Sequence, residues 1–81
     1  MATGKQLVEI ADGLRTGEGY DENLKNVENV KSYALDSMGI EITDEEARKI
    51  QQCLKRLNRE NDKNGNWSHN WYTCVVYPLS E

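Results

Sequence analysis

The fold class expected for this chain depends on one stretch near its carboxyl end, Trp71-Tyr72-Thr73-Cys74-Val75-Val76-Tyr77. The stretch is rich in β-branched and aromatic residues, which favour strands over helices. Pro78 follows it directly, and a proline has no backbone N–H group to donate to a neighbouring strand. The composition therefore predicts a β-strand over residues 71–77.

A β-strand needs a partner, because its backbone N–H and C=O groups must be hydrogen-bonded where they are buried. Within the chain, residues 40–42 are a short extended candidate, and residues 67–69 would pair with the strand through a short turn. A second copy of the chain, giving a homodimer, or another protein would pair with it by strand addition. All three remain open, and each predicts a β-hairpin or a two-to-three-stranded sheet built on residues 71–77.

Three short helices are predicted before the strand. The first spans residues 4–15, and the second starts with Asp21 as its cap and ends at Gly39. The third starts at a capping box formed by Thr43 and Glu46 and fades near Glu60. Apolar residues at helical spacing predict the core, which consists of Leu7, Ile10, Ala11, Leu14, Leu24, Val27, Val30, Ala34, Leu35, Met38, Ala47, Ile50, Cys53, Leu54 and Leu57. The expected architecture is a single α+β domain over residues 1–81.

The composition is that of one small domain, with 81 residues of which 37% are hydrophobic and 30% charged. The sequence has no apolar run near the ~20 residues of a membrane span, and residues 1–6 lack the apolar stretch of a signal peptide. These features predict a cytoplasmic protein that does not bind a membrane. In that compartment Cys53 and Cys74 are expected to be reduced thiols.

The charges are segregated along the chain. Residues 1–47 carry eleven acidic and four basic side chains, whereas residues 48–63 carry six basic and two acidic ones. The acidic part contains a cluster that we call the acidic corner, which consists of Asp36, Glu41, Asp44, Glu45 and Glu46. The basic part forms adjoining rows on the outside of the third helix, a basic face that consists of Arg48, Lys49, Lys55, Arg56, Arg59 and Lys63.

Aromatic residues concentrate near the carboxyl end, where Trp67, Trp71, Tyr72 and Tyr77 are four of the six in the chain. A strand presents two faces, and three short helices would not cover both of them. Part of this aromatic strand is therefore expected at the surface, as an anchor for a partner. Trp71 is assigned to the core and Tyr72 to the surface, because the larger ring gains more from burial.

The residue patterns predict neither a catalytic site nor a cofactor or metal site. Cys53, His69 and Cys74 lack the short paired spacings of zinc ligands, and His69 has no nucleophile or acid at a recognisable spacing. Residues 62–67 resemble the middle of a calcium-binding loop with Gly65 at its sharp turn, but Trp71 stands where the loop requires a bidentate carboxylate. The chain is therefore not expected to be an enzyme.

Together these features predict a non-catalytic, acidic protein-binding module that acts as an inhibitor or adaptor, with the size and charge of many accessory proteins of viruses and mobile elements. The acidic corner would dock on the basic groove of a larger nucleic-acid-handling protein, and the aromatic strand would anchor the contact. The alternative is a DNA-binding helical domain that uses the basic face of residues 48–63. Nucleic acid ranks second because the acidic start of the third helix is the end that would meet the bases.

Overall fold

The computed structural model describes residues 2–80, and every regular element in that range is helical. In chain order the elements are α1 (Gly4–Thr16), α2 (Tyr20–Lys25), α3 (Val27–Met38), α4 (Asp44–Lys63), α5 (Trp67–Trp71), the π-helical turn η1 (Tyr72–Val76) and α6 (Tyr77–Ser80). The predicted α+β fold is therefore wrong, since the described part of the chain is all-α and contains no strand.

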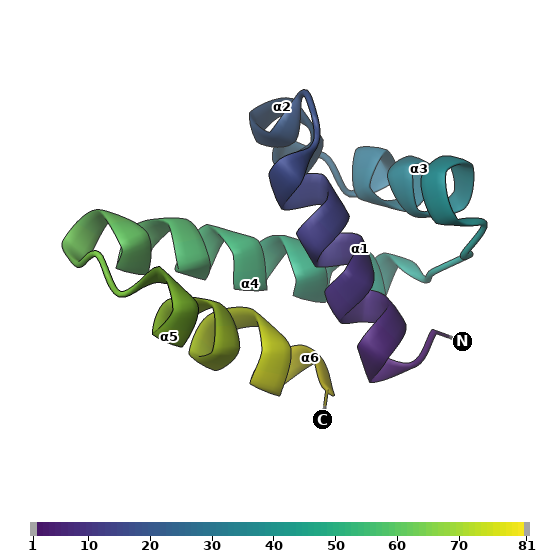
Figure 1. Cartoon of the computed structure of the whole chain (residues 1–81). Helices are drawn as coiled ribbons and strands as arrows, with labels where there is room; N and C mark the ends of the chain where they lie inside the picture. The colour runs from purple at the N-terminus through teal and green to yellow at the C-terminus, as the bar shows by residue number, and fades with distance from the viewer. Residues whose placement is uncertain (1, 81) are drawn as a thin grey trace.

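The central element is α4, which contacts every other helix. In Figure 1, α1 crosses α4, α2 and α3 lie above it, and the run from α5 to α6 lies below it. We call this run, residues 67–80, the C-terminal helical segment. It turns back along α4 after residue 66, so that α6 ends beside the start of α1 (Figure 1).

The core is built from apolar stripes on α1, α3 and α4. The predicted stripes of the first and third helices are confirmed, with buried side chains at Leu7, Ile10, Ala11, Leu14, Ala47, Ile50, Cys53, Leu54 and Leu57. Leu24, Val30 and Ala34 are also buried as predicted, whereas Val27 and Met38 are only partly buried. Leu35 is exposed, so its placement in the core is wrong. The C-terminal helical segment completes the core with Cys74, Val75 and Leu79.

Most helix ends follow the caps in the sequence, but three predictions about them are wrong. The second helix begins at Tyr20 after Gly19, so Asp21 lies inside it and is not its cap. The helix expected to fade near Glu60 continues to Lys63. The capping box is confirmed, because the Glu46 amide donates to Thr43 Oγ1 at 3.1 Å and the Thr43 amide donates to Glu46 Oε1 at 3.0 Å. Gly39 ends α3 in the left-handed region at φ 67°, also as predicted. The single helix expected over residues 21–39 is wrong: the chain breaks at Asn26, whose side chain accepts from the Glu28 amide at 2.9 Å and caps α3.

The C-terminal helical segment replaces the predicted strand, and residues 40–42 and 67–69 do not pair with it as strands. In a helix the backbone N–H and C=O groups bond within the segment, so no partner strand is needed. The Tyr77 amide donates to the Tyr72 carbonyl, five residues back, which is the pattern of a π turn. Pro78 directly follows this π turn and does not end the helical run, which continues to Ser80. The prediction that Pro78 ends the element is therefore wrong.

Asparagine side chains hold the reversal between α4 and the C-terminal helical segment. Asn70 is buried, with 3% of its surface exposed. Its amide nitrogen donates to Asn61 Oδ1 at 2.9 Å and to Asn64 Oδ1 at 3.1 Å. Asn64 Oδ1 also accepts from the Asn66 amide at 2.9 Å. The last turn of α4, the reversal and α5 are therefore linked by one set of hydrogen bonds, which we call the asparagine clamp.

A glycine substitution tests the contact between the two ends of the fold. A Cβ atom on Gly4 would lie 2.7 Å from Ser80 Cα and 2.8 Å from the Leu79 carbonyl oxygen, whereas one on Gly65 would meet nothing within 4 Å. We expect Gly4→Ala to lower the free energy of unfolding by ~1–3 kcal/mol, the usual cost of overpacking. Gly65→Ala is the matched control and should change it by less than ~0.5 kcal/mol. Equal melting temperatures for the two variants would contradict this packing of α1 on α6.

Candidate functional site

The structure places the three predicted surfaces apart from one another. The acidic corner lies at the end of α3 and the start of α4, and the basic face runs along α4. The aromatic residues lie on the C-terminal helical segment, which begins beyond the other end of α4. Because α4 has 20 residues, it is about 30 Å long at 1.5 Å per residue. The acidic corner and Trp67 are therefore at opposite ends of α4, although the rest of the C-terminal helical segment runs back along α4 (Figure 1).

The aromatic residues form a surface on the C-terminal helical segment, although the strand expected to carry them is absent from the described chain. Trp67, Tyr72 and Tyr77 are 65%, 51% and 59% exposed. The rings of Tyr72 and Tyr77 lie 6.1 Å apart between centroids. Trp71 packs partly against the core. The assignment of Trp71 inward and Tyr72 outward agrees with the structure, but its cause is the turn of a helix and not the alternation of a strand. We call these four residues the aromatic surface.

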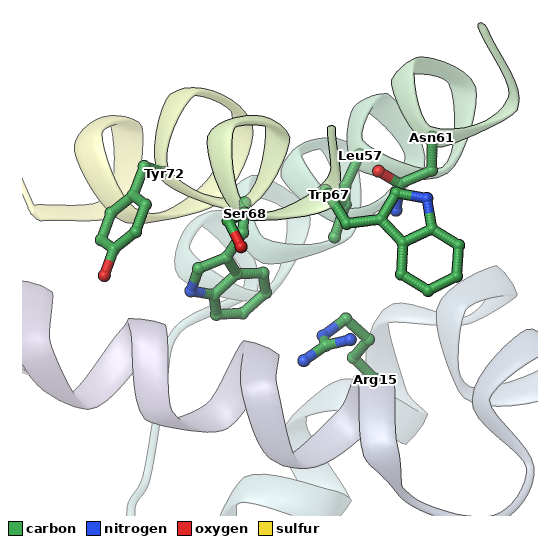
Figure 2. A pocket seen from close by; sticks show the side chains of 7 residues that line it. Arg15, Leu57, Asn61, Trp67, Ser68 and Tyr72 are labelled. Carbon is green, nitrogen blue, oxygen red and sulfur yellow. The ribbon is translucent and has the colours of Figure 1, made fainter. Parts of the chain in front are cut away.

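A hollow of about 350 Å³ opens beside the aromatic surface. Its lining residues come from α1, α4 and the C-terminal helical segment and are Arg15, Leu57, Asn61, Trp67, Ser68, Trp71 and Tyr72 (Figure 2). The guanidinium carbon of Arg15 lies 4.9 Å from the centroid of the Trp71 ring, a cation–π contact. Arg15 also donates to Asp12 Oδ1 at 3.2 Å. Sequence reasoning missed Arg15, because no pattern links a residue of α1 to an aromatic residue so far along the chain.

A second hollow, of about 420 Å³, shares no lining residue with the first and lies against the basic face. We call it the basic groove. Its lining comes from α4 and the C-terminal helical segment and consists of Gln52, Cys53, Lys55, Arg56, Arg59, Cys74 and Pro78. Both cysteines are buried and neither forms a disulfide, which agrees with the prediction of free thiols. The floor of the groove is therefore apolar and its rim carries three cations.

The cations of the basic face are largely without carboxylate partners. Within residues 2–80 its ion pair is that of Lys63 with Glu60, at 3.3 Å. The other five members have no carboxylate within 4.0 Å in the described chain, and these are Arg48, Lys49, Lys55, Arg56 and Arg59. Within residues 2–80, the cations of the basic groove are therefore left for an anionic ligand to meet.

The acidic corner is partly neutralised in the fold. Lys31, which α3 brings to the start of α4, donates to Asp44 Oδ1 at 2.8 Å. This hydrogen bond lowers the pKa of Asp44 and raises that of Lys31. Glu46 is occupied by the capping box. Exposed carboxylates remain at Asp36, Glu41 and Glu45, so the corner carries less free charge than its sequence indicates.

Other kinds of site have little support in the described residues. Over residues 2–80 the fold does not gather three or more His, Cys, Asp or Glu side chains that could hold a metal ion. Among the helices described, none is both long enough and apolar enough to cross a membrane. Comparisons with protein-family models, with curated proteins and with solved structures give no significant match to this chain. Its function is therefore inferred from the aromatic surface, the basic groove and the acidic corner alone.

The thiol of Cys53 offers a chemical probe of the basic groove. Burial raises the pKa of this thiol, against the smaller opposing effect of Lys49 and Arg56. We therefore expect Cys53 to be alkylated by iodoacetamide more slowly in the native protein than in urea at neutral pH, because the thiolate is the nucleophile. The native rate should keep rising with pH beyond the range in which a free thiol has fully ionised. Equal native and denatured rates at neutral pH, measured by peptide mass spectrometry, would show that Cys53 is not buried.

Proposed function

We propose that this chain is a non-catalytic protein-binding module, an adaptor or inhibitor, that contacts its partner through the aromatic surface. The observation that carries the proposal is the exposure of Trp67, Tyr72 and Tyr77, each more than half exposed on the same short segment. Clustered exposed aromatic side chains mark interaction sites on proteins. Tryptophan and tyrosine are also the side chains that most often contribute the binding energy of an interface.

The backbone that carries the aromatic surface is tied to the rest of the fold at Asn70 and Trp71, which favours binding. Trp71 is fixed between the core and Arg15, and Asn70 ties the segment to α4 through the asparagine clamp. Side chains that are ordered before binding lose less conformational entropy when a partner arrives. The hollow beside Trp67 and Tyr72 offers room for an apolar side chain of the partner. Because the segment is helical, the partner meets side chains, and strand addition is not part of the proposal.

The acidic corner contributes to encounter more than to contact. It lies at the other end of α4 from Trp67, so a partner that touches both must span about the length of that helix, ~30 Å. Its exposed carboxylates, at Asp36, Glu41 and Glu45, attract a basic partner over about one Debye length, ~8 Å at physiological salt. A larger nucleic-acid-handling protein, with a positively charged cleft of its own, has the size and the charge that this arrangement requires.

DNA reading by α4 has weaker support than protein binding. A recognition helix contacts base edges with its amino-terminal residues. The first turn of α4 carries Asp44, Glu45 and Glu46, and carboxylates at that end repel the phosphates on either side of a DNA groove. The basic face begins only after this turn. The alternative of a DNA-binding domain is therefore kept as a second candidate, which the experiment below separates from the first.

Capture from the native cell, with and without nuclease, separates the two candidates and supplies the partner. We expect a protein partner that stays bound to the chain after nuclease treatment.

Tyr72→Ala combined with Tyr77→Ala should then speed dissociation of that partner at least tenfold, about the effect of losing one interface anchor. Leu35→Ala is the matched control, since Leu35 is 54% exposed on α3. Unchanged dissociation in a folded double tyrosine variant would contradict the proposal, as would loss of all captured protein after nuclease.

Charge reversal tests the role of the acidic corner. Glu41→Lys with Glu45→Lys should slow association with the same partner and weaken its dependence on salt, while dissociation changes little. These two residues are chosen because both are exposed and neither belongs to the capping box or to the Lys31 ion pair. Association kinetics at low and physiological salt provide the measurement. An effect confined to dissociation would place the corner inside the contact instead.

A further inference from the structure

The basic groove combines a cationic rim with an apolar floor. Lys55, Arg56 and Arg59 are exposed along its rim, and they lie on adjoining turns of α4. The floor contains the buried thiols of Cys53 and Cys74, with Pro78 at its edge. The ligand that suits such a groove has anionic groups around an apolar centre.

The charge of the groove calls for more than one anionic group. Its lining includes Lys55, Arg56 and Arg59, and all three are without a carboxylate partner within residues 2–80. Arginine side chains form two parallel hydrogen bonds with a carboxylate or a phosphate, which makes both groups suitable partners. The rim alone therefore fits either an acidic protein segment or a nucleic-acid backbone.

The floor decides between these two. A sugar–phosphate backbone has no apolar group to cover Cys53, Cys74 and Pro78. Proteins that bind single-stranded nucleic acids stack the bases on aromatic side chains. None of the residues that line the basic groove is aromatic, whereas Trp67, Trp71 and Tyr72 line the other hollow. An apolar side chain flanked by carboxylates matches both the floor and the rim.

We propose that the basic groove binds an acidic segment of a protein, with one apolar side chain on the floor and the flanking carboxylates on Lys55, Arg56 and Arg59. This site is separate from the aromatic surface, since the two hollows share no lining residue. The chain would then hold two protein surfaces at once, which is what distinguishes an adaptor from a simple inhibitor. The second surface does not depend on the first being correct.

Four labelled probes of similar length test the proposal by fluorescence anisotropy with the full chain. Two are peptides, one with glutamates around a single leucine and one of glutamates alone. The other two are a mixed-sequence DNA in single-stranded form and the same DNA as a duplex. We expect the leucine-containing peptide to bind most tightly, the all-glutamate peptide several-fold more weakly, and both forms of DNA more weakly than the first peptide. Tighter binding of either DNA form would overturn the proposal in favour of a nucleic-acid surface.

Charge-matched variants localise the binding. Arg56→Glu with Arg59→Glu should weaken binding of the leucine-containing peptide at least tenfold. Lys5→Glu with Lys25→Glu is the control, because it makes the same change in net charge at exposed positions of α1 and α2. Both variants are checked for folding by circular dichroism. Equal weakening in the two variants would overturn the proposal, because it would show a response to overall charge and not to the groove.

The floor has its own readout. The bound leucine-containing peptide should slow alkylation of Cys53, and the all-glutamate peptide should slow it less. Tyr72→Ala with Tyr77→Ala should bind the peptide normally, so failure of the aromatic surface and failure of the groove are distinguishable. The proposal would be contradicted if no probe bound, or if the bound peptide did not protect Cys53 from alkylation. It would also be contradicted if sedimentation showed a dimer whose interface covers the groove.

Discussion

The asparagine clamp is the constraint on which the arrangement of this molecule depends. A buried amide costs about 1–3 kcal/mol if its hydrogen bonds are not made, and Asn70 is buried. Its partners, Asn61 and Asn64, lie on the last turns of α4 and just after it. Asn70 is satisfied only when the chain reverses directly after α4. The clamp therefore fixes where the C-terminal helical segment starts and which side of α4 it covers.

Both candidate surfaces follow from this reversal. Placing Val75 and Leu79 in the core leaves Tyr72 and Tyr77 exposed. Trp71 is brought over Arg15 of α1, which forms the hollow beside the aromatic surface. Cys74 and Pro78 are brought to the outer rows of α4, which forms the basic groove. The π turn matters here, because its extra residue lets Cys74, Val75 and Leu79 share one buried face.

The sequence predicted α1 and α4 well because their apolar stripes and caps are local signals. Thr43 and Glu46 specify the start of α4 within four residues, and the stripe from Ala47 to Leu57 faces the core as expected. Residues 71–77 misled because β-branched and aromatic residues favour strands only when a neighbouring strand is present. The burial pattern of the C-terminal helical segment is helical, since the buried side chains are those of Asn70, Cys74, Val75 and Leu79. The partner strands available within the chain, residues 40–42 and 67–69, have only three residues each. Their shortness was the signal against a strand at residues 71–77.

The candidate sites were predictable only in part, since each combines distant segments. The basic face was readable along one helix, but the thiol and proline floor beside it needs the C-terminal helical segment.

Helical placement of residues 67–80 is thus the central claim, and the most direct test is an assigned NMR spectrum of the intact chain. We expect helical Cα shifts through residues 71–77 and slow exchange of the Asn70 side-chain amide protons. Strand-type shifts over residues 71–77, with contacts to residues 40–42, would contradict it.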